Sequence, residues 1–173
     1  MQIIHSFHIT PREYFKRGKN NDFPRIDVCP CCSHPSTLPR HGFYWRNALF
    51  RRQEFRIPIL RLKCNSCEKT ISLLPDFLLP CFQYSLKFIL GALRRFFLGR
   101  KNTTNYQLLQ FYRQRFLKNL NRIEVFFRDQ GYRGIVPEKQ RAIKLLELID
   151  AFPKAGAFAK RFQDHFLRNF MAN

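Results

Sequence analysis

Two pairs of cysteines with metal-ligand spacing lie in the first half of the chain. Cys29 and Cys32 form one Cys-x-x-Cys pair, Cys64 and Cys67 form another, and 31 residues separate the pairs. A two-residue spacer lets both thiolates of a tight turn face one ion, and zinc favours four such ligands in a tetrahedron. A shell closed by four cysteines leaves no position for a substrate. The spacing therefore predicts a structural zinc ion, which would hold the fold and perform no chemistry.

Other interpretations of these thiols are a redox pair and buried apolar side chains. A Cys-Pro-x-Cys redox pair needs a helix N-terminus within a βαβ unit, and the sequence around Cys29 shows neither. Burial without a ligand suits Cys81 better than two paired motifs. We expect Cys31 to be a spare thiol, although it is an alternative ligand to Cys32. His34 and His41 are further candidate ligands, for which a surface position is the favoured interpretation.

The chain is strongly basic, with 31 Lys and Arg against 12 Asp and Glu and a net charge of +19. Residues 29–80 carry eight basic and three acidic groups, and residues 81–134 carry eleven and two. Residues 1–28 and 135–173 are closer to balance, with five against three and seven against four. A field of this sign attracts polyanions, so we expect nucleic acid at the two middle segments. The 20 Phe residues indicate a folded aromatic core and not a disordered basic tail.

The elements that would position these groups predict an α+β fold, with a small three-stranded antiparallel zinc ribbon followed by an all-α helical domain. Short alternating segments at 38–46, 53–63 and 69–73 are the expected strands. We predict four parts: an N-terminal extension at 1–28, the ribbon domain with its apolar linker at 29–80, a basic helical region resembling a degenerate helix-turn-helix at 81–134, and a C-terminal helical hairpin at 135–173.

Apolar periodicity predicts the helices of the second half. One helix is expected at 85–98 and a single longer one from 104 to 127. Pro137 opens a further helix through Ile149, and the last helix carries four phenylalanines spaced four residues apart. We interpret that stripe as core; the alternative is a groove for a protein partner or a second copy. The four are Phe158, Phe162, Phe166 and Phe170.

The candidate nucleic-acid contacts come from the first hairpin and the basic helical region. Gln can present a paired donor and acceptor, and Arg a pair of donors, to base edges in the major groove of duplex DNA, whereas Lys mainly neutralises phosphate. The alternative is that any amphipathic helix or hairpin in so basic a chain exposes such residues, with Phe43 or Trp45 covering the ribbon core. The candidates are Arg40, Arg46, Arg51, Arg52, Arg94, Arg95, Arg100, Lys101, Gln110, Arg113, Gln114 and Lys118.

The sequence predicts no membrane partner. No run approaches the ~20 apolar residues of a spanning helix, and the start lacks a basic segment followed by an apolar one. We expect a cytoplasmic, nucleoid-associated protein, because thiols stay reduced there and can bind metal.

Several motifs together carry a family resemblance. These are Cys29-Pro30-x-Cys32, Arg40-His41-Gly42-x-Tyr44, Cys64-x-x-Cys67, and the string from Ser72 to Pro80 followed by Tyr84-Ser85-Leu86. Over roughly residues 27–98 the chain resembles a functionally uncharacterised bacterial zinc-ribbon family related to the N-terminal ribbons of insertion-sequence transposases. The resemblance implies that Cys29, Cys32, Cys64 and Cys67 bind zinc and that a helix-turn-helix follows. The chain departs from that pattern, because about six polar residues stand where a middle helix and turn belong.

These observations favour a non-enzymatic, zinc-stabilised DNA-binding protein, transposase-derived or accessory to a mobile element, with a regulatory role. One alternative is an RNA-binding or protein-assembly module within a larger nucleoprotein complex. Another is a truncated transposase or nuclease subunit, but two-metal chemistry needs converging carboxylates and the twelve acids are scattered along the chain.

Overall fold

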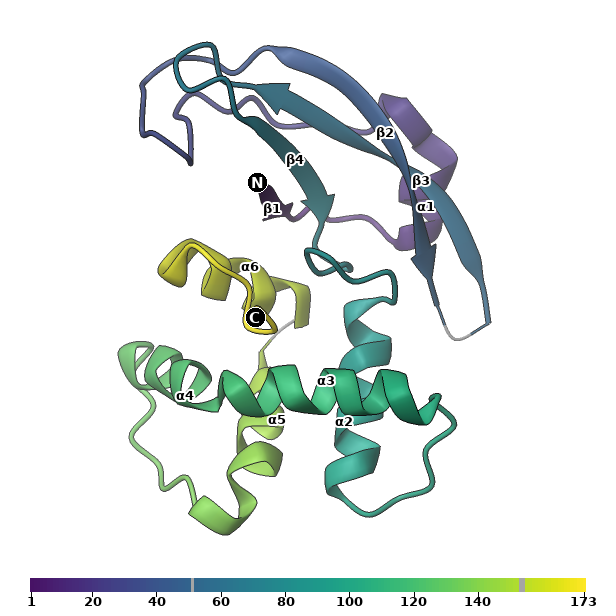
Figure 1. The fold of residues 1–173 in the computed structure, drawn as a ribbon, viewed down its shortest axis with the longest axis vertical. Helices are drawn as coiled ribbons and strands as arrows, with labels where there is room; N and C mark the ends of the chain where they lie inside the picture. The colour runs from purple at the N-terminus through teal and green to yellow at the C-terminus, as the bar shows by residue number, and fades with distance from the viewer. Residues whose placement is uncertain (51, 153–154) are drawn as a thin grey trace. The chain divides into compact units, whose positions relative to one another are not determined.

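The computed structural model describes residues 1–50, 52–152 and 155–173, which form two compact units, Met1–Tyr84 and Ser85–Asn173 (Figure 1). Met1–Tyr84 is called unit 1, and Ser85–Asn173 is called unit 2. Unit 1 contains a β-sheet and a short helix, and unit 2 is built from α-helices. The predicted mixture of a β-sheet module followed by helices is thus confirmed. No helix in the described parts of the chain is long and apolar enough to span a membrane.

Unit 1 opens with a strand and a helix before its β-hairpin. Thr10 accepts a hydrogen bond from the backbone N–H of Glu13, whose carboxylate accepts one from the Thr10 N–H, and this reciprocal pair fixes the helix start. The elements are β1 (Gln2–His5), α1 (Pro11–Arg17), a 3₁₀ turn η1 (Gly18–Asn20), β2 (Arg40–Leu49), β3 (Glu54–Lys63) and β4 (Thr70–Pro75).

The described sheet has four strands in the order β1-β4-β3-β2, so the prediction of three antiparallel strands is wrong. β2, β3 and β4 are antiparallel neighbours, but β1 adds to β4 in parallel, with Gln2 opposite Ser72 and Ile4 opposite Leu74. The terminal amine of Met1 donates to the Thr70 carbonyl at 2.8 Å. Residues 2–5 therefore belong to the sheet and form one of its edge strands.

β2 and β3 form a hairpin and are the longest strands of the described sheet, with ten residues each. β2 is the other edge strand of the sheet (Figure 1). The register shifts between Arg40 and Gly42, and Gly42 has a φ of 108°, a conformation that side chains with a Cβ rarely adopt. From Gly42 onward the strands pair regularly to Leu49 and Glu54. The bulge sets which side chains of β2 face the core.

Tyr14 of α1 anchors the aromatic core beside the sheet. Its ring is fully buried and contacts Phe7, Phe23 and Phe77 edge-on. The hydroxyl donates to the Pro58 carbonyl at 2.9 Å. Burial raises the pKa of this hydroxyl, so it stays a neutral donor that ties α1 to β3.

Unit 2 consists of five α-helices and one 3₁₀ turn within the described residues. Ser85 caps the first of them by accepting from the backbone N–H of Phe88, and Asn105 caps the second. The elements are α2 (Leu86–Phe97), α3 (Tyr106–Lys118), α4 (Leu120–Asp129), η2 (Glu138–Gln140), α5 (Arg141–Ala151) and α6 (Ala155–Phe166).

The predicted single helix from 104 to 127 is two helices, α3 and α4, separated at Asn119. Asn119 leaves the helical region with φ −102° and ψ 3° and is fully buried. Its side-chain amide donates to the carbonyls of Arg115 and Ala172, both at 2.8 Å. The apolar period continues through Asn119 and gives no sign of the break. One of the carbonyls that accept from the Asn119 amide belongs to Ala172, far along the sequence.

The phenylalanine stripe of the C-terminal region lies mainly in the core of unit 2. Phe158, Phe162 and Phe170 are fully buried, and Phe166 is half-buried against Phe162. Phe170 lies beyond the end of α6, where Leu167 takes a left-handed φ of 54° and turns the chain back. The ring of Phe170 packs 5.0 Å from that of Phe158. The core interpretation of the stripe thus describes three of its four rings.

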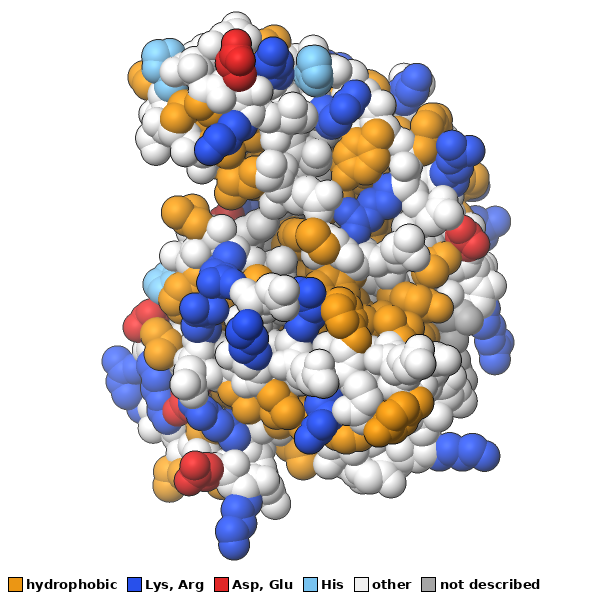
Figure 2. All heavy atoms as spheres, in the orientation of Figure 1, with side chains coloured by type: hydrophobic (Ala, Val, Ile, Leu, Met, Phe, Trp, Pro, Cys, Tyr) orange, Lys and Arg blue, Asp and Glu red, His pale blue; other side chains and the backbone are white. Residues whose placement is uncertain are grey.

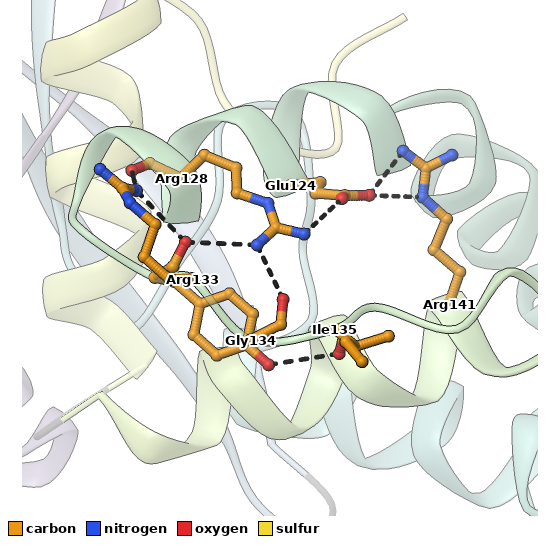
Figure 3. Close-up of polar contacts among 7 residues, drawn as sticks. Glu124, Arg128, Arg133, Gly134, Ile135 and Arg141 are labelled. Carbon is orange, nitrogen blue, oxygen red and sulfur yellow. Dashed lines mark hydrogen bonds and ion pairs between the residues drawn. The ribbon is translucent and has the colours of Figure 1, made fainter.

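Glu124 joins two arginines across the loop between α4 and α5 (Figure 3). Its carboxylate accepts from Arg128 at 3.2 Å and from Arg141 at 2.8 Å. Arg128 also donates to the carbonyls of Tyr132 and Gly134, at 3.3 and 2.7 Å. Glu124 therefore joins α4 to α5, and Arg128 ties the loop after α4 to that helix.

We expect Glu124→Gln to lower the free energy of unfolding by about 1–2 kcal/mol, because both guanidinium groups lose their charged acceptor in a partly buried place. The Glu124 side chain is 22% exposed. Glu147→Gln is the matched control: its ion pair with Lys144 has a 60% exposed carboxylate, and we expect a change below about 0.5 kcal/mol. Thermal and urea unfolding would measure both variants, and equal effects would contradict this role of Glu124.

Candidate metal centre and basic surfaces

The four cysteines of the two motifs lie together in unit 1. The sulfur atoms of Cys29, Cys32, Cys64 and Cys67 are all within 4.8 Å of one another. The Sγ atoms of Cys29 and Cys67 are 3.8 Å apart, as are those of Cys32 and Cys64. A Zn–S bond of about 2.3 Å in a regular tetrahedron sets neighbouring sulfurs about 3.8 Å apart. The spacing therefore fits one tetrahedral ion with four thiolate ligands.

Two turns of the same shape present these sulfurs. Cys64 follows β3 and Cys67 precedes β4, so the second pair lies in the β3–β4 connection, while the first pair lies in the loop before β2. In each turn the first cysteine donates its backbone N–H to a carbonyl five residues later, that of His34 or Lys69, at 3.1 and 3.0 Å. The residue after the second cysteine has a left-handed φ in both turns, 58° at Ser33 and 56° at Glu68. The local sequence thus builds each half of the site, and the sheet brings the halves together.

The thiols differ in their affinity for protons. Burial raises the pKa of Cys29, but hydrogen bonds from the backbone N–H groups of Cys31 and Cys32 and from the neighbouring thiols outweigh it and lower the pKa to about 6. The pKa of Cys67 is raised to about 11: the Lys69 N–H favours the thiolate, and burial together with the other three thiols outweighs that contribution. The cluster thus ionises one thiol readily and resists further negative charge, and a divalent cation would offset that charge.

The remaining candidate ligands lie outside the cluster. The Cys31 thiol lies 3.7 Å from the thioether sulfur of Met1, and Cys81 is exposed after the linker. His34 offers its backbone carbonyl to Cys29, and both His34 and His41 are exposed. Among the described residues no second group of three or more His, Cys, Asp or Glu side chains converges. The four-sulfur cluster is therefore the metal-binding candidate of the described chain.

The predicted nucleic-acid contacts of unit 1 differ in how free they are. Arg40 and Arg52 are exposed at the two ends of the hairpin region, and Arg51 lies outside the described residues. Arg46 is half-buried and donates to the carbonyls of Leu79 and Phe82, at 3.1 and 2.5 Å. Part of the Arg46 guanidinium is thus engaged with the linker, whereas Arg40 and Arg52 face solvent.

The basic residues around the end of α2 also differ in whether they are engaged within the protein or exposed to solvent. Arg94 forms an ion pair with Asp150 of α5, and Arg95 is half-buried. Arg100 and Lys101 are exposed in the segment between α2 and α3. Of these four residues, the last two offer unobstructed positive charge.

One face of α3 is exposed over its full length. Leu109, Tyr112 and Phe116 are buried, and the opposite stripe is exposed. Gln110 and Arg113 lie at the flank, where Arg113 donates to Gln110 at 3.2 Å and packs over the ring of Phe96, 5.4 Å from its centre. The exposed stripe consists of Gln107, Phe111, Gln114 and Lys118. Of the predicted α3 contacts, Gln114 and Lys118 are free, and Gln110 and Arg113 form a pair with each other.

Positive charge dominates the visible surface of both units. Figure 2 shows many Lys and Arg side chains and few Asp and Glu on this face. Four residues that line a surface hollow of unit 1 beside Trp45 and Arg46 were not among the predicted contacts, namely Asn47, Glu54, Arg56 and Gln83. The pairing of Asn47 with Arg56 in the hairpin was the available signal, because paired residues of antiparallel strands point to the same face.

One comparison with known proteins gives a match. Residues 29–108, a little under half of the chain, match the model of a domain of unknown function (DUF6431). No curated protein and no solved structure matches. The matched segment begins at Cys29, contains all four clustered cysteines and continues through α2 into α3. The domain family thus joins the cysteine cluster to the first helices of unit 2.

Proposed function

We propose that the chain is a non-enzymatic, zinc-stabilised DNA-binding protein, derived from or accessory to the transposase of a mobile element, with a regulatory role. The observation that carries this proposal is the net charge of +19, together with exposed Lys and Arg on both units. Such a charge releases counterions from a polyphosphate chain, and counterion release supplies most of the sequence-independent affinity for DNA.

In this proposal zinc is the ion of the four-sulfur cluster, and unit 1 is a zinc ribbon extended by β1. Four thiolates in a tetrahedron suit zinc or iron, and zinc needs no redox partner. Cys29, Cys32, Cys64 and Cys67 would hold the ion, which closes two loops far apart in the sequence. The ion's role is to fix the end of the sheet from which the β2–β3 hairpin extends.

The exposed stripe of α3 is the proposed DNA-contacting element of unit 2. Gln107 and Gln114 can pair with base edges, and Lys118 can neutralise phosphate. These side chains stand opposite the buried face of α3, so they can approach a duplex without opening the core. α2, α3 and α4 would then serve as a degenerate helix-turn-helix, with Arg100 and Lys101 at the phosphates.

A competition experiment tests this proposal. The zinc-loaded chain is bound to labelled duplex DNA, and unlabelled duplex DNA, single-stranded DNA and structured RNA are added at equal phosphate concentration. We expect blunt duplex DNA to compete best, because α3 fits the major groove of B-form DNA and not the deep, narrow one of an RNA helix. Stronger competition by RNA would support the RNA-binding alternative instead. Strand cleavage of the DNA in the presence of Mg²⁺ would contradict the non-enzymatic assignment.

A further inference from the structure

Trp45 is the one tryptophan of the chain, and half of its surface is exposed. It lies on β2, the edge strand of the sheet, opposite Pro58 of β3. Tryptophan is highly buried on average and is enriched at binding surfaces, where an apolar face meets a partner. The core of unit 1 covers only part of this side chain, so the exposed part of the indole is available for a ligand.

Trp45 lines a hollow of about 820 Å³ that is open to solvent. Asn47 pairs with Arg56 across the hairpin, and the Arg56 guanidinium lies 5.8 Å from the centre of the Trp45 ring. Gln83, in the segment between β4 and α2, is held at the edge of β2, because its carbonyl accepts from the Leu49 N–H at 2.9 Å. The lining residues are Trp45, Arg46, Asn47, Glu54, Arg56 and Gln83.

The chemistry of this lining matches the parts of a nucleotide. An indole face stacks on a base, an arginine neutralises phosphate or stacks, and side-chain amides offer a donor and an acceptor to the edge of the base. The Glu54 carboxylate repels phosphate and can accept from an N–H group on the edge of a base. The charges therefore direct the phosphate toward Arg56 and leave the amides to the base.

We propose that the Trp45 hollow binds an unpaired nucleobase of the bound nucleic acid, stacked on the indole, with the adjoining phosphate at Arg56. This inference rests on the proposed function, since it presupposes that the chain binds nucleic acid. A base within a perfect duplex is stacked on both faces and cannot reach the indole. The hollow thus selects nucleic acid that contains unstacked bases, such as a bulge or a junction with a single strand.

Because the chain has one tryptophan, its fluorescence reports directly on this site. The full zinc-loaded chain is titrated with three DNA hairpins of the same length: one fully paired, one with a bulge of three thymines, and one with three abasic residues in the bulge. We expect the thymine bulge alone to quench the indole fluorescence, because a base stacks on the ring. We also expect it to bind about tenfold more tightly than the paired hairpin, which corresponds to about 1.4 kcal/mol.

Variants separate this inference from the proposed function. In an anisotropy assay, we expect Trp45→Ala to remove the preference for the bulge and to leave the affinity for the paired hairpin unchanged, whereas Trp45→Phe, which keeps a ring, retains most of the preference. Tyr106→Ala is the matched control, because Tyr106 is 71% exposed on unit 2. Equal affinity for all three hairpins, quenching by the abasic bulge, or an unchanged preference in Trp45→Ala would each overturn the inference alone. Binding to none of the hairpins would overturn the proposed function as well.

Discussion

Replacing two of the four sulfurs, in a Cys64→Ser, Cys67→Ser variant, is expected to reduce the zinc content from about one ion per chain to none. The thermal unfolding midpoint of unit 1 should fall by more than about 10 °C. Structural zinc contributes roughly 10–16 kcal/mol of apparent binding free energy to small domains. Even a fifth of that free energy is a large part of the stability of such a domain. Elemental analysis for zinc and iron, together with circular dichroism during heating, measures both effects.

The two other cysteines provide a matched control for the metal prediction. Cys31 and Cys81 lie outside the cluster, so a Cys31→Ser, Cys81→Ser variant removes as many thiols but no predicted ligand. We expect it to keep its zinc and its unfolding midpoint. A cluster variant with normal metal content would remove the assignment, and metal loss in the control would place Cys31 among the ligands.

The cysteine cluster could be predicted from the sequence because each half of it is local. A Cys-x-x-Cys turn is specified by a few consecutive residues, and its two-residue spacer is typical of cysteines that bind one ion together. The caps at Thr10 and Ser85 are local in the same sense, because each accepts from a backbone N–H three residues later. The start of α2 at Leu86 lies one residue from the predicted start at 85. Features of this kind depend on neighbours within four residues, which the sequence displays directly.

The predictions that were wrong, of a three-stranded sheet and of a single helix from 104 to 127, depend on contacts between distant parts of the chain. β1 has four residues and a weak alternation, and what makes it a strand is β4, about 70 residues later. Asn119 breaks the long helix because Ala172, 53 residues away, accepts its side-chain amide. Neither partner can be recognised from the local sequence, so periodicity alone predicted one helix where there are two and left β1 out of the predicted sheet.

The basic surface could be predicted in sign and in approximate place, but not residue by residue. Arg46 donates to carbonyls more than 30 residues away, and Arg94 forms an ion pair with Asp150. Composition cannot distinguish such engaged side chains from exposed ones such as Arg100. The structure therefore narrows the list of candidate contacts, with Lys101 and Lys118 among those exposed.

The affinity of the chain for duplex DNA is expected to fall steeply as the salt concentration rises, because the net charge of +19 is proposed to drive binding. If the exposed cations of the two units neutralise about six to ten phosphates, the association constant should drop by about 10³ to 10⁵ between 50 and 200 mM salt. Fluorescence anisotropy across a salt series gives the slope of the logarithm of the association constant against that of the salt concentration. An affinity that does not change with salt would contradict the proposal that charge drives binding.

Paired charge variants locate the contacts that set this slope. Arg100→Gln with Lys101→Gln removes two exposed cations from the segment between α2 and α3, and we expect the slope to become shallower by about two if both contact phosphate. Lys16→Gln with Arg17→Gln is the matched control, because it removes two adjacent exposed cations from α1, in the part of the sequence nearest to charge balance. Both variants lose the same net charge. A general attraction by the whole field predicts equal slopes for them, whereas contact at specific phosphates predicts a change in the first variant alone.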